Sequence, residues 1–159
     1  MNTKKAALSL ALLCSVVYAE QTPSLHEVCR NGLKEEAQRL INEGTDINLV
    51  HEKSGNTALM EAAREFDVEL VRMLTDNENI EINACNKAGN NALMEAFSSG
   101  QACTEADCSD KVALNEIVSL LIERGIDLTH TNDSGESAMA LAEKNGFSEA
   151  LDVIKKSHK

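Results

Sequence analysis

The chain has 159 residues, of which 26% are charged, and its formal net charge is −11. The length fits one domain. So acidic a surface repels phosphate backbones and anionic lipid heads, which argues against nucleic acid or a membrane as the partner. It suits a basic protein partner, and solubility alone accounts for the acidity equally well.

Residues 1–19 have the pattern of a cleaved secretory signal. Lys4 and Lys5 form a basic start, and residues 6–17 are almost wholly apolar. The apolar run is too short for a membrane span, and an uncleaved anchor or a buried N-terminal helix is the alternative interpretation. Cleavage removes two lysines and no acidic residue, which takes the net charge from −11 to −13. We expect residues 20–159 to form a secreted or periplasmic protein with no membrane association.

A seven-residue stretch recurs along the chain. Asn-Thr-Ala-Leu-Met-Glu-Ala at residues 56–62 returns thirty-four residues later as Asn-Asn-Ala-Leu-Met-Glu-Ala at residues 90–96, and a glycine precedes both copies. Weaker copies begin at Pro23 and Ser137. A fixed period of about 33 residues is typical of stacked repeats, in which each unit buries its apolar face only against its neighbours.

Each unit consists of a glycine turn, a short helix and a second helix. In the second unit we predict helices over about residues 57–65 and 68–75. Leu59 and Ala62 are spaced to share one face of the first helix. Thr57 is suited to be its N-cap, because a threonine hydroxyl accepts hydrogen bonds from the amides of the first turn.

The repeated residues resemble the ankyrin repeat. The second unit matches that pattern with Gly55, Thr57, Leu59, Ala62, Ala63, Glu69, Leu70, Val71, Leu74, Ile82 and Asn83. The resemblance implies an all-α ankyrin-repeat solenoid of four helix-turn-helix units with short hairpin-like turns. The units cover about residues 22–54, 55–88, 89–134 and 135–156. Met60 and Met94 replace the histidine of the pattern, and we expect them to fill gaps in the core.

The third unit contains an insertion, residues 101–113, between its two helices. Insertions in repeat arrays form loops on one face and often contribute to binding. A tolerated surface loop is an equal alternative, because lengthening a loop costs little free energy. The acidic residues of the segment do not fit the spacing of a calcium-binding EF-hand.

Four cysteines follow the signal segment. An exported protein permits disulfides, and four cysteines can pair in three ways. Cys103 and Cys108 lie five residues apart in the insertion, which makes them the candidate pair for a local disulfide. Cys29 falls at a small-residue core position of the first unit, where we expect a buried apolar side chain. The cysteine spacing does not resemble a zinc site, and we expect no metal and no cofactor.

The sequence contains no recognisable catalytic constellation, and we do not expect an enzyme. It has no phosphate-binding glycine loop and no H-E-x-x-H motif. His51 and His130 fall in the turns between units, where we expect solvated side chains. Glu61 and Glu95 recur at one position of the repeat, and we interpret that position as an exposed face of the helix rather than as an acidic ladder.

By the resemblance, the protein is a non-enzymatic scaffold or inhibitor that binds another protein and is itself a monomer. The contact surface of the family is the concave face, made by the turn tips and the exposed end of the first helix of each unit. Carried over unit by unit, the contact residues are Arg30; Glu52, Lys53, Asn56, Arg64 and Glu65; Lys87, Asn90 and Ser98; and Asp133, Glu136 and Lys144.

More specific alternatives are a toxin-neutralising immunity protein and a stabilising partner of a periplasmic enzyme, for example in oxidative stress defence. A metal-binding protein or an enzyme is a remote alternative.

Overall fold

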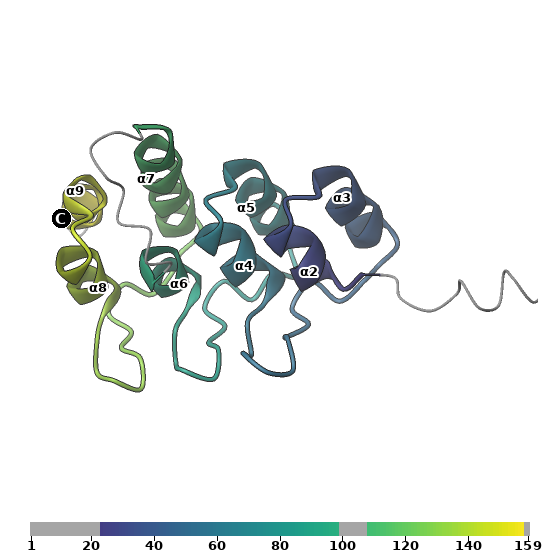
Figure 1. The fold of residues 1–159 in the computed structure, drawn as a ribbon, viewed down its shortest axis with the longest axis horizontal. Coiled ribbons are helices and arrows are strands. Elements are labelled where there is room, and N and C mark those ends of the chain that lie inside the picture. Colours follow the sequence, from purple (N-terminus) through teal and green to yellow (C-terminus); the bar gives the residue numbers. More distant parts are fainter. Residues whose placement is uncertain (1–22, 99–107, 158–159) are drawn as a thin grey trace, which may run out of the picture.

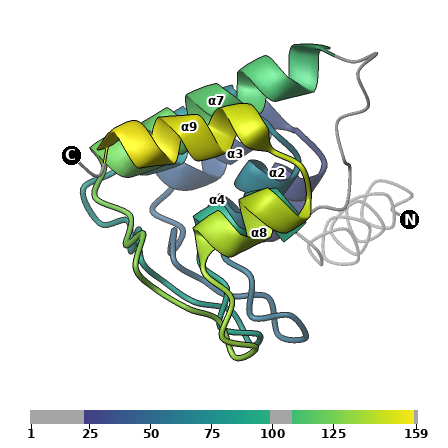
Figure 2. The same ribbon diagram turned by 90° about the vertical axis from the view of Figure 1, so that its left-hand side faces the viewer.

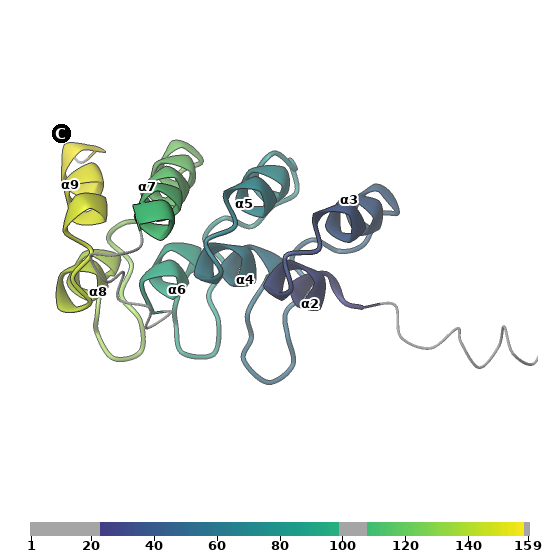
Figure 3. The ribbon, with the colours of Figure 1, turned by 45° about the horizontal axis from the view of Figure 1, so that its top comes forward.

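A computed structural model describes residues 23–98 and 108–157 of the chain. The helices form two rows, with the first helix of each unit in an inner row and the second in an outer row (Figures 1 and 3). The inner row comprises α2 (Leu25–Arg30), α4 (Ala58–Arg64), α6 (Ala92–Ser98) and α8 (Ala138–Lys144). The outer row comprises α3 (Lys34–Asn42), α5 (Val68–Thr75), α7 (Cys108–Glu123) and α9 (Ser148–Ser157). The predicted all-α solenoid of stacked helix pairs is confirmed.

The inner helices α4, α6 and α8 begin at side-chain caps, as the sequence predicts for Thr57. Its Oγ1 accepts a hydrogen bond from the backbone N–H of Met60 at 3.3 Å. Asn91 caps α6 through Oδ1 at 3.0 Å from the N–H of Met94, and Ser137 caps α8 in the same way. A cap satisfies an amide that has no partner within the first turn, so each helix starts at a defined residue.

The core lies between the two rows and runs continuously through the units. Leu59 and Leu74 are at most 1% exposed, and the methionines of the repeat, Met60 and Met94, are buried beside them. Cys29 is fully buried, as predicted. Small residues on the inner helices let neighbouring units approach closely, which is how a unit too small to fold alone becomes stable.

Between the outer helix of one unit and the inner helix of the next, the chain forms a hairpin-like turn. We call these turns finger 1 (residues 51–56), finger 2 (residues 86–90) and finger 3 (residues 132–136). A backbone hydrogen bond closes each one, from the first residue to the carbonyl of the last, at 2.8, 2.9 and 3.0 Å. All three project to the same side of the molecule, away from the outer helices (Figure 2).

The third unit departs from the prediction. The expected loop over residues 101–113 is wrong at its C-terminal end, because Cys108 to Ala113 belong to α7. This helix has 16 residues, against 8 in α5, and it runs past α9 (Figure 2). The helix continues because no proline or glycine interrupts these residues. Residues 101–107 lie outside the described part, so the disulfide between Cys103 and Cys108 stays a prediction.

Candidate protein-binding surface

The three fingers are bonded to one another along the molecule. The backbone N–H of Lys87 in finger 2 donates to the carbonyl of Ser54 in finger 1 at 3.1 Å, and Asp133 in finger 3 donates to Ala88 in finger 2 at the same distance. The contact is close, since a Cβ on Gly55 would lie 2.8 Å from the nitrogen of Lys87. The fingers therefore form a connected row rather than independent loops, and we call fingers 1, 2 and 3 together the finger row.

Two asparagine side chains join the bases of successive turns. Asn48 donates from Nδ2 to the carbonyl of Asn79 at 2.7 Å and accepts at Oδ1 from the N–H of Glu81 at 2.9 Å. Asn83 repeats this clamp one unit later, accepting from the N–H of Asp127 at 2.7 Å. Each amide replaces a bond that the irregular backbone lacks, which fixes the spacing between units.

A chain of side-chain hydrogen bonds connects the fingers to the inner helices. We call it the polar ladder, and it comprises Glu61, Asn56, Asn86, Glu95, Asn90 and Asn132. Asn86 donates to Oδ1 of Asn56 and to Oε1 of Glu95, both at 2.8 Å. Asn132 donates to Oδ1 of Asn90 at 2.9 Å. The amides thus bridge each unit to the next, and such networks rigidify a structure when their members are satisfied.

The ladder corrects our interpretation of the repeated glutamates as exposed. Glu61 is fully buried and Glu95 is 7% exposed. Asn56 and Arg30 both donate to Oε1 of Glu61, at 3.0 and 2.9 Å, and Arg30 also donates to Oε2 at 3.2 Å. Burial alone would raise the pKa of Glu61, but the bonds from Arg30 and Asn56 outweigh it and hold the pKa below its usual value.

Two of the predicted contact residues are corrected for the same reason. Asn56 and Asn90 are 3% and 8% exposed and belong to the ladder, so neither presents its side chain to a partner. The others lie at the surface, with Glu136 half-buried and the rest exposed: Arg30, Glu52, Lys53, Arg64, Glu65, Lys87, Ser98, Asp133, Glu136 and Lys144.

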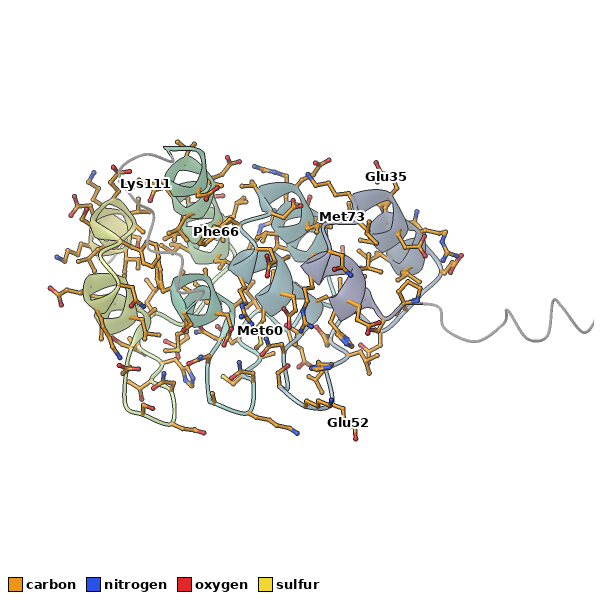
Figure 4. All side chains as sticks on the ribbon, viewed as in Figure 1. Glu35, Glu52, Met60, Phe66, Met73 and Lys111 are labelled. Carbon is orange, nitrogen blue, oxygen red and sulfur yellow. The ribbon has the colours of Figure 1, made fainter. Side chains whose placement is uncertain are left out.

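Several of these surface side chains are held in place. Lys87 reaches from finger 2 to the carbonyl of Glu52 in finger 1 at 2.6 Å, and Glu52 itself lies at the tip of finger 1 (Figure 4). Glu136 in finger 3 forms an ion pair with Lys144 at 2.7 Å. The finger row thus offers fixed charges of both signs on the side opposite Lys111 of the outer row (Figure 4).

His26 packs against His51 at the start of the row, with ring centroids 4.8 Å apart. The hydroxyl of Ser24 donates to Glu27 at 3.0 Å, so it accepts from Nε2 of His26, also at 3.0 Å. In the neutral ring Nδ1 of His26 is then the unprotonated nitrogen, and that atom is buried without a hydrogen-bond partner. Burial, followed by the neighbouring His51, lowers the pKa of His26.

Cys85 and His130 meet between units but do not form a nucleophile and base. Nε2 of His130 lies 2.7 Å from the carbonyl of Gly89, which can only accept, so this nitrogen carries the proton. The same nitrogen is 3.3 Å from Sγ of Cys85 and cannot take the thiol proton. Partial burial, and then Asp127, raise the pKa of Cys85. His130 is half-buried and bonded, in contrast to the solvated side chain we expected.

The described surface has hollows on the outer row and beside a turn. One, of about 30 Å³, lies between α7 and the turn before α9 and is lined by Lys111 and Phe147. The other is an open groove beside Asp46 and Asn77. Neither lining includes a histidine or a cysteine. Among residues 23–98 and 108–157, no group of three or more His, Cys, Asp or Glu could hold a metal ion, and no helix is long and apolar enough to cross a membrane.

A family model described as ankyrin repeats (3 copies) matches residues 25–106, more than half of the chain. The chain belongs to the ankyrin repeat family. This family consists of repeat scaffolds that generally mediate protein–protein interaction, in agreement with the exposed finger row. The helices α8 and α9, which follow the matched residues, add a fourth helix pair to the array.

Solved ankyrin structures share the fold. An ankyrin repeat domain from Acinetobacter baumannii AYE superposes with a TM-score of 0.72 at 24% identity, covering 84% of this chain and 63% of that one. The ankyrin repeat domain of Bcl-3, a member of the IkappaB protein family, gives a TM-score of 0.64 at 23% identity, covering 82% and 50%. The chain spans less than two thirds of either domain, and at these identities the likeness concerns the fold.

A curated relative matches over a shorter stretch. The human 2-5A-dependent ribonuclease is 45% identical over 47 residues, which is 30% of this chain and 6% of that protein. A match of this length covers little more than one repeat, so the nuclease activity in the name belongs to that protein.

Proposed function

We propose that this chain is an exported, non-enzymatic ankyrin protein that binds another protein through its finger row and the exposed ends of its inner helices. The connected row itself is the observation that carries the proposal. Its backbone bonds and the polar ladder fix three turns side by side, while charged side chains such as Lys53 and Asp133 stay exposed on it. Export rests on the signal-like pattern of residues 1–19.

The mechanism is rigid display of charged side chains. A surface that is ordered before binding loses little conformational entropy when the partner arrives. Exposed charges such as Lys53 and Glu65 then select orientation and partner, and they affect the association rate more than the affinity. The mature acidic chain as a whole, at −13 after loss of the two lysines of residues 1–19, attracts a basic partner over a longer range. A scaffold, an inhibitor or immunity protein, and a stabilising subunit would all use this surface in the same way.

Affinity capture from the export compartment tests the proposal. The wild-type chain is compared with a variant of the finger tips, Lys53→Glu with Lys87→Glu, and with a matched control in the last turn of α9, Lys155→Glu with Lys156→Glu. All four lysines are exposed, and both variants change the charge equally. We expect one stoichiometric partner that the finger variant loses and the control keeps.

Capture of no partner, or a partner that the finger variant retains, would overturn the proposal. A further version that replaces residues 101–107 by a glycine–serine linker of equal length shows whether the insertion contributes. The identity of the partner then decides among the roles: a lethal enzyme indicates neutralisation, and an enzyme whose activity falls without the chain indicates stabilisation.

A further inference from the structure

The polar ladder contains two carboxylate sites that are built alike. In the first, the Nδ2 of Asn56 donates to Oε1 of Glu61 at 3.0 Å, and the guanidinium of Arg30 donates to both carboxylate oxygens. Arg30 comes from the preceding inner helix and is half-exposed, while Glu61 is fully buried. This arrangement shows how a guanidinium binds to a glutamate of the repeat that also accepts a hydrogen bond from an asparagine.

The second site repeats the pairing of an asparagine with a glutamate one unit later. Asn90 stands thirty-four residues after Asn56, and its Nδ2 donates to Oε1 of Glu95 at 2.9 Å. Asn86 donates to the same oxygen at 2.8 Å. Glu95 is only 7% exposed. No donor of the described residues bonds to its Oε2.

The cation of the first site has no counterpart on Glu95. Arg64 stands thirty-four residues after Arg30, but its side chain is exposed and forms no ion pair with the described residues. Among residues 23–98 and 108–157, the donors to this nearly buried carboxylate are therefore the neutral amides of Asn86 and Asn90. A buried charge is stabilised mainly by a paired opposite charge, so this site favours a cation more strongly than an exposed glutamate does.

We propose that Glu95, with Asn86 and Asn90, forms a binding site for an arginine side chain of the partner protein, and we call this site the arginine seat. The inference rests on the proposed function and specifies the partner: a protein that inserts an exposed arginine beside the finger row. Arginine fits better than lysine, because a planar guanidinium donates to both oxygens of one carboxylate, as Arg30 does at Glu61. An arginine held in a desolvated site is also a common energetic centre of an interface.

The internal competitor is Arg64, which would occupy the same seat if it turned toward Glu95. A double-mutant cycle separates the two. If the seat is free for a partner, the shifts in urea midpoint of Arg64→Ala and Glu95→Gln add up independently in the double variant. Non-additivity as large as that of Arg30→Ala with Glu61→Gln would place Arg64 on Glu95 and overturn the proposal.

The direct test titrates the mature chain with the peptide acetyl-Gly-Gly-Arg-Gly-Gly-amide, and with its citrulline analogue, which keeps the shape and lacks the charge. The readout is the NMR shift of the side-chain amides of Asn86 and Asn90. We expect both amides to shift with the arginine peptide, and the affinity to fall on the order of ten-fold with citrulline or in Glu95→Gln. Glu116→Gln, an exposed glutamate of α7, is the matched control and should bind normally.

Equal binding of the two peptides, or equal binding by Glu95→Gln, would overturn the arginine seat. Circular dichroism confirms that Glu95→Gln is folded before it is titrated. Because the peptide replaces the partner, this outcome is separate from the capture experiment. If the finger variant loses its partner but the chain binds the arginine and citrulline peptides equally, the proposed function is supported and the arginine seat is refuted.

Discussion

The guanidinium of Arg30, at the end of the first inner helix, spans to the next unit and donates to both carboxylate oxygens of the fully buried Glu61 at 2.9 and 3.2 Å. This pair links two helices that are distant in sequence and belongs to a hydrogen-bonded chain reaching finger 3. It explains how a glutamate can be fully buried between ankyrin units, since each of its oxygens has a donor.

Removal of this cation should destabilise the chain. In Arg30→Ala the carboxylate of Glu61 stays buried with a single amide donor, and we expect a loss of about 2 kcal/mol in the free energy of unfolding. Arg72→Ala is the matched control, because the Arg72–Glu116 pair is about half-exposed on both sides and such pairs contribute about 0–1 kcal/mol. Urea unfolding measures both. Equal losses would show that Glu61 does not depend on Arg30.

The close contact between fingers predicts a difference between two glycines. Gly89 and Gly135 both have φ of 74°, so alanine should cost about 1 kcal/mol at either one from backbone strain. At Gly89 the added Cβ would also lie 2.8 Å from Oδ1 of Asp133, whereas at Gly135 it meets nothing within 4 Å. Gly89→Ala should therefore lose roughly 1–3 kcal/mol more. Equal losses in thermal or urea unfolding would contradict the packed row.

Acid should weaken the first unit through His26. The pKa of His26 is lowered in the fold, by burial and then by His51, with smaller opposing effects from Glu27 and Glu61 and a smaller lowering effect from Arg30. The fold thus favours the neutral ring. This contribution is complete above the ordinary pKa of 6.5 and is lost as the pH falls from there toward the lowered value.

Replacement of His26 by methionine tests this pH dependence with a residue the array already accepts, because Met60 and Met94 stand at the same repeat position. Urea midpoints measured between about pH 7 and pH 5 should fall for the wild-type chain and fall less for His26→Met. Parallel slopes for the two proteins would assign the acid sensitivity to other groups.

The described cysteines should differ in reactivity. Cys29 is fully buried, and burial raises its pKa to about 12, with Asp67 as the next cause. Cys85 is exposed. Because the thiolate is the reactive form, brief alkylation with iodoacetamide at mild alkaline pH should label Cys85 and spare Cys29 in the folded chain. Mass spectrometry of the peptides gives the result, and labelling of both in urea is the control. Rapid native labelling of Cys29 would mean that the first unit opens readily.

Local pattern was enough to predict the second unit. The predicted second helix over residues 68–75 has the observed bounds of α5, and the predicted cap, Thr57, bonds to the first turn of α4. Both features depend on neighbours within four residues, namely apolar spacing and an N-cap hydroxyl. The insertion was harder to interpret, because an acidic, cysteine-containing stretch resembles a loop although nothing in residues 108–113 breaks a helix.

The candidate site was predicted only in part, because its chemistry is long-range. Glu61 looks exposed by residue type, and its burial depends on Arg30, which lies thirty-one residues away. Asn56 and Asn90 look like turn residues, yet they donate to the glutamates of the inner helices. A signal was present: in both units an asparagine follows the turn glycine, and a glutamate comes five residues after it. Identical polar pairs in two units indicate a shared buried contact.

The measurement that tests the central claim most directly is amide hydrogen exchange of the chain, free and in complex with the captured partner. If the finger row is the binding surface, added protection should concentrate in residues 51–56, 86–90 and 132–136 and at the C-terminal ends of α4 and α6. Protection that appears instead on α3, α5, α7 and α9, with the fingers exchanging as in the free chain, would contradict the account.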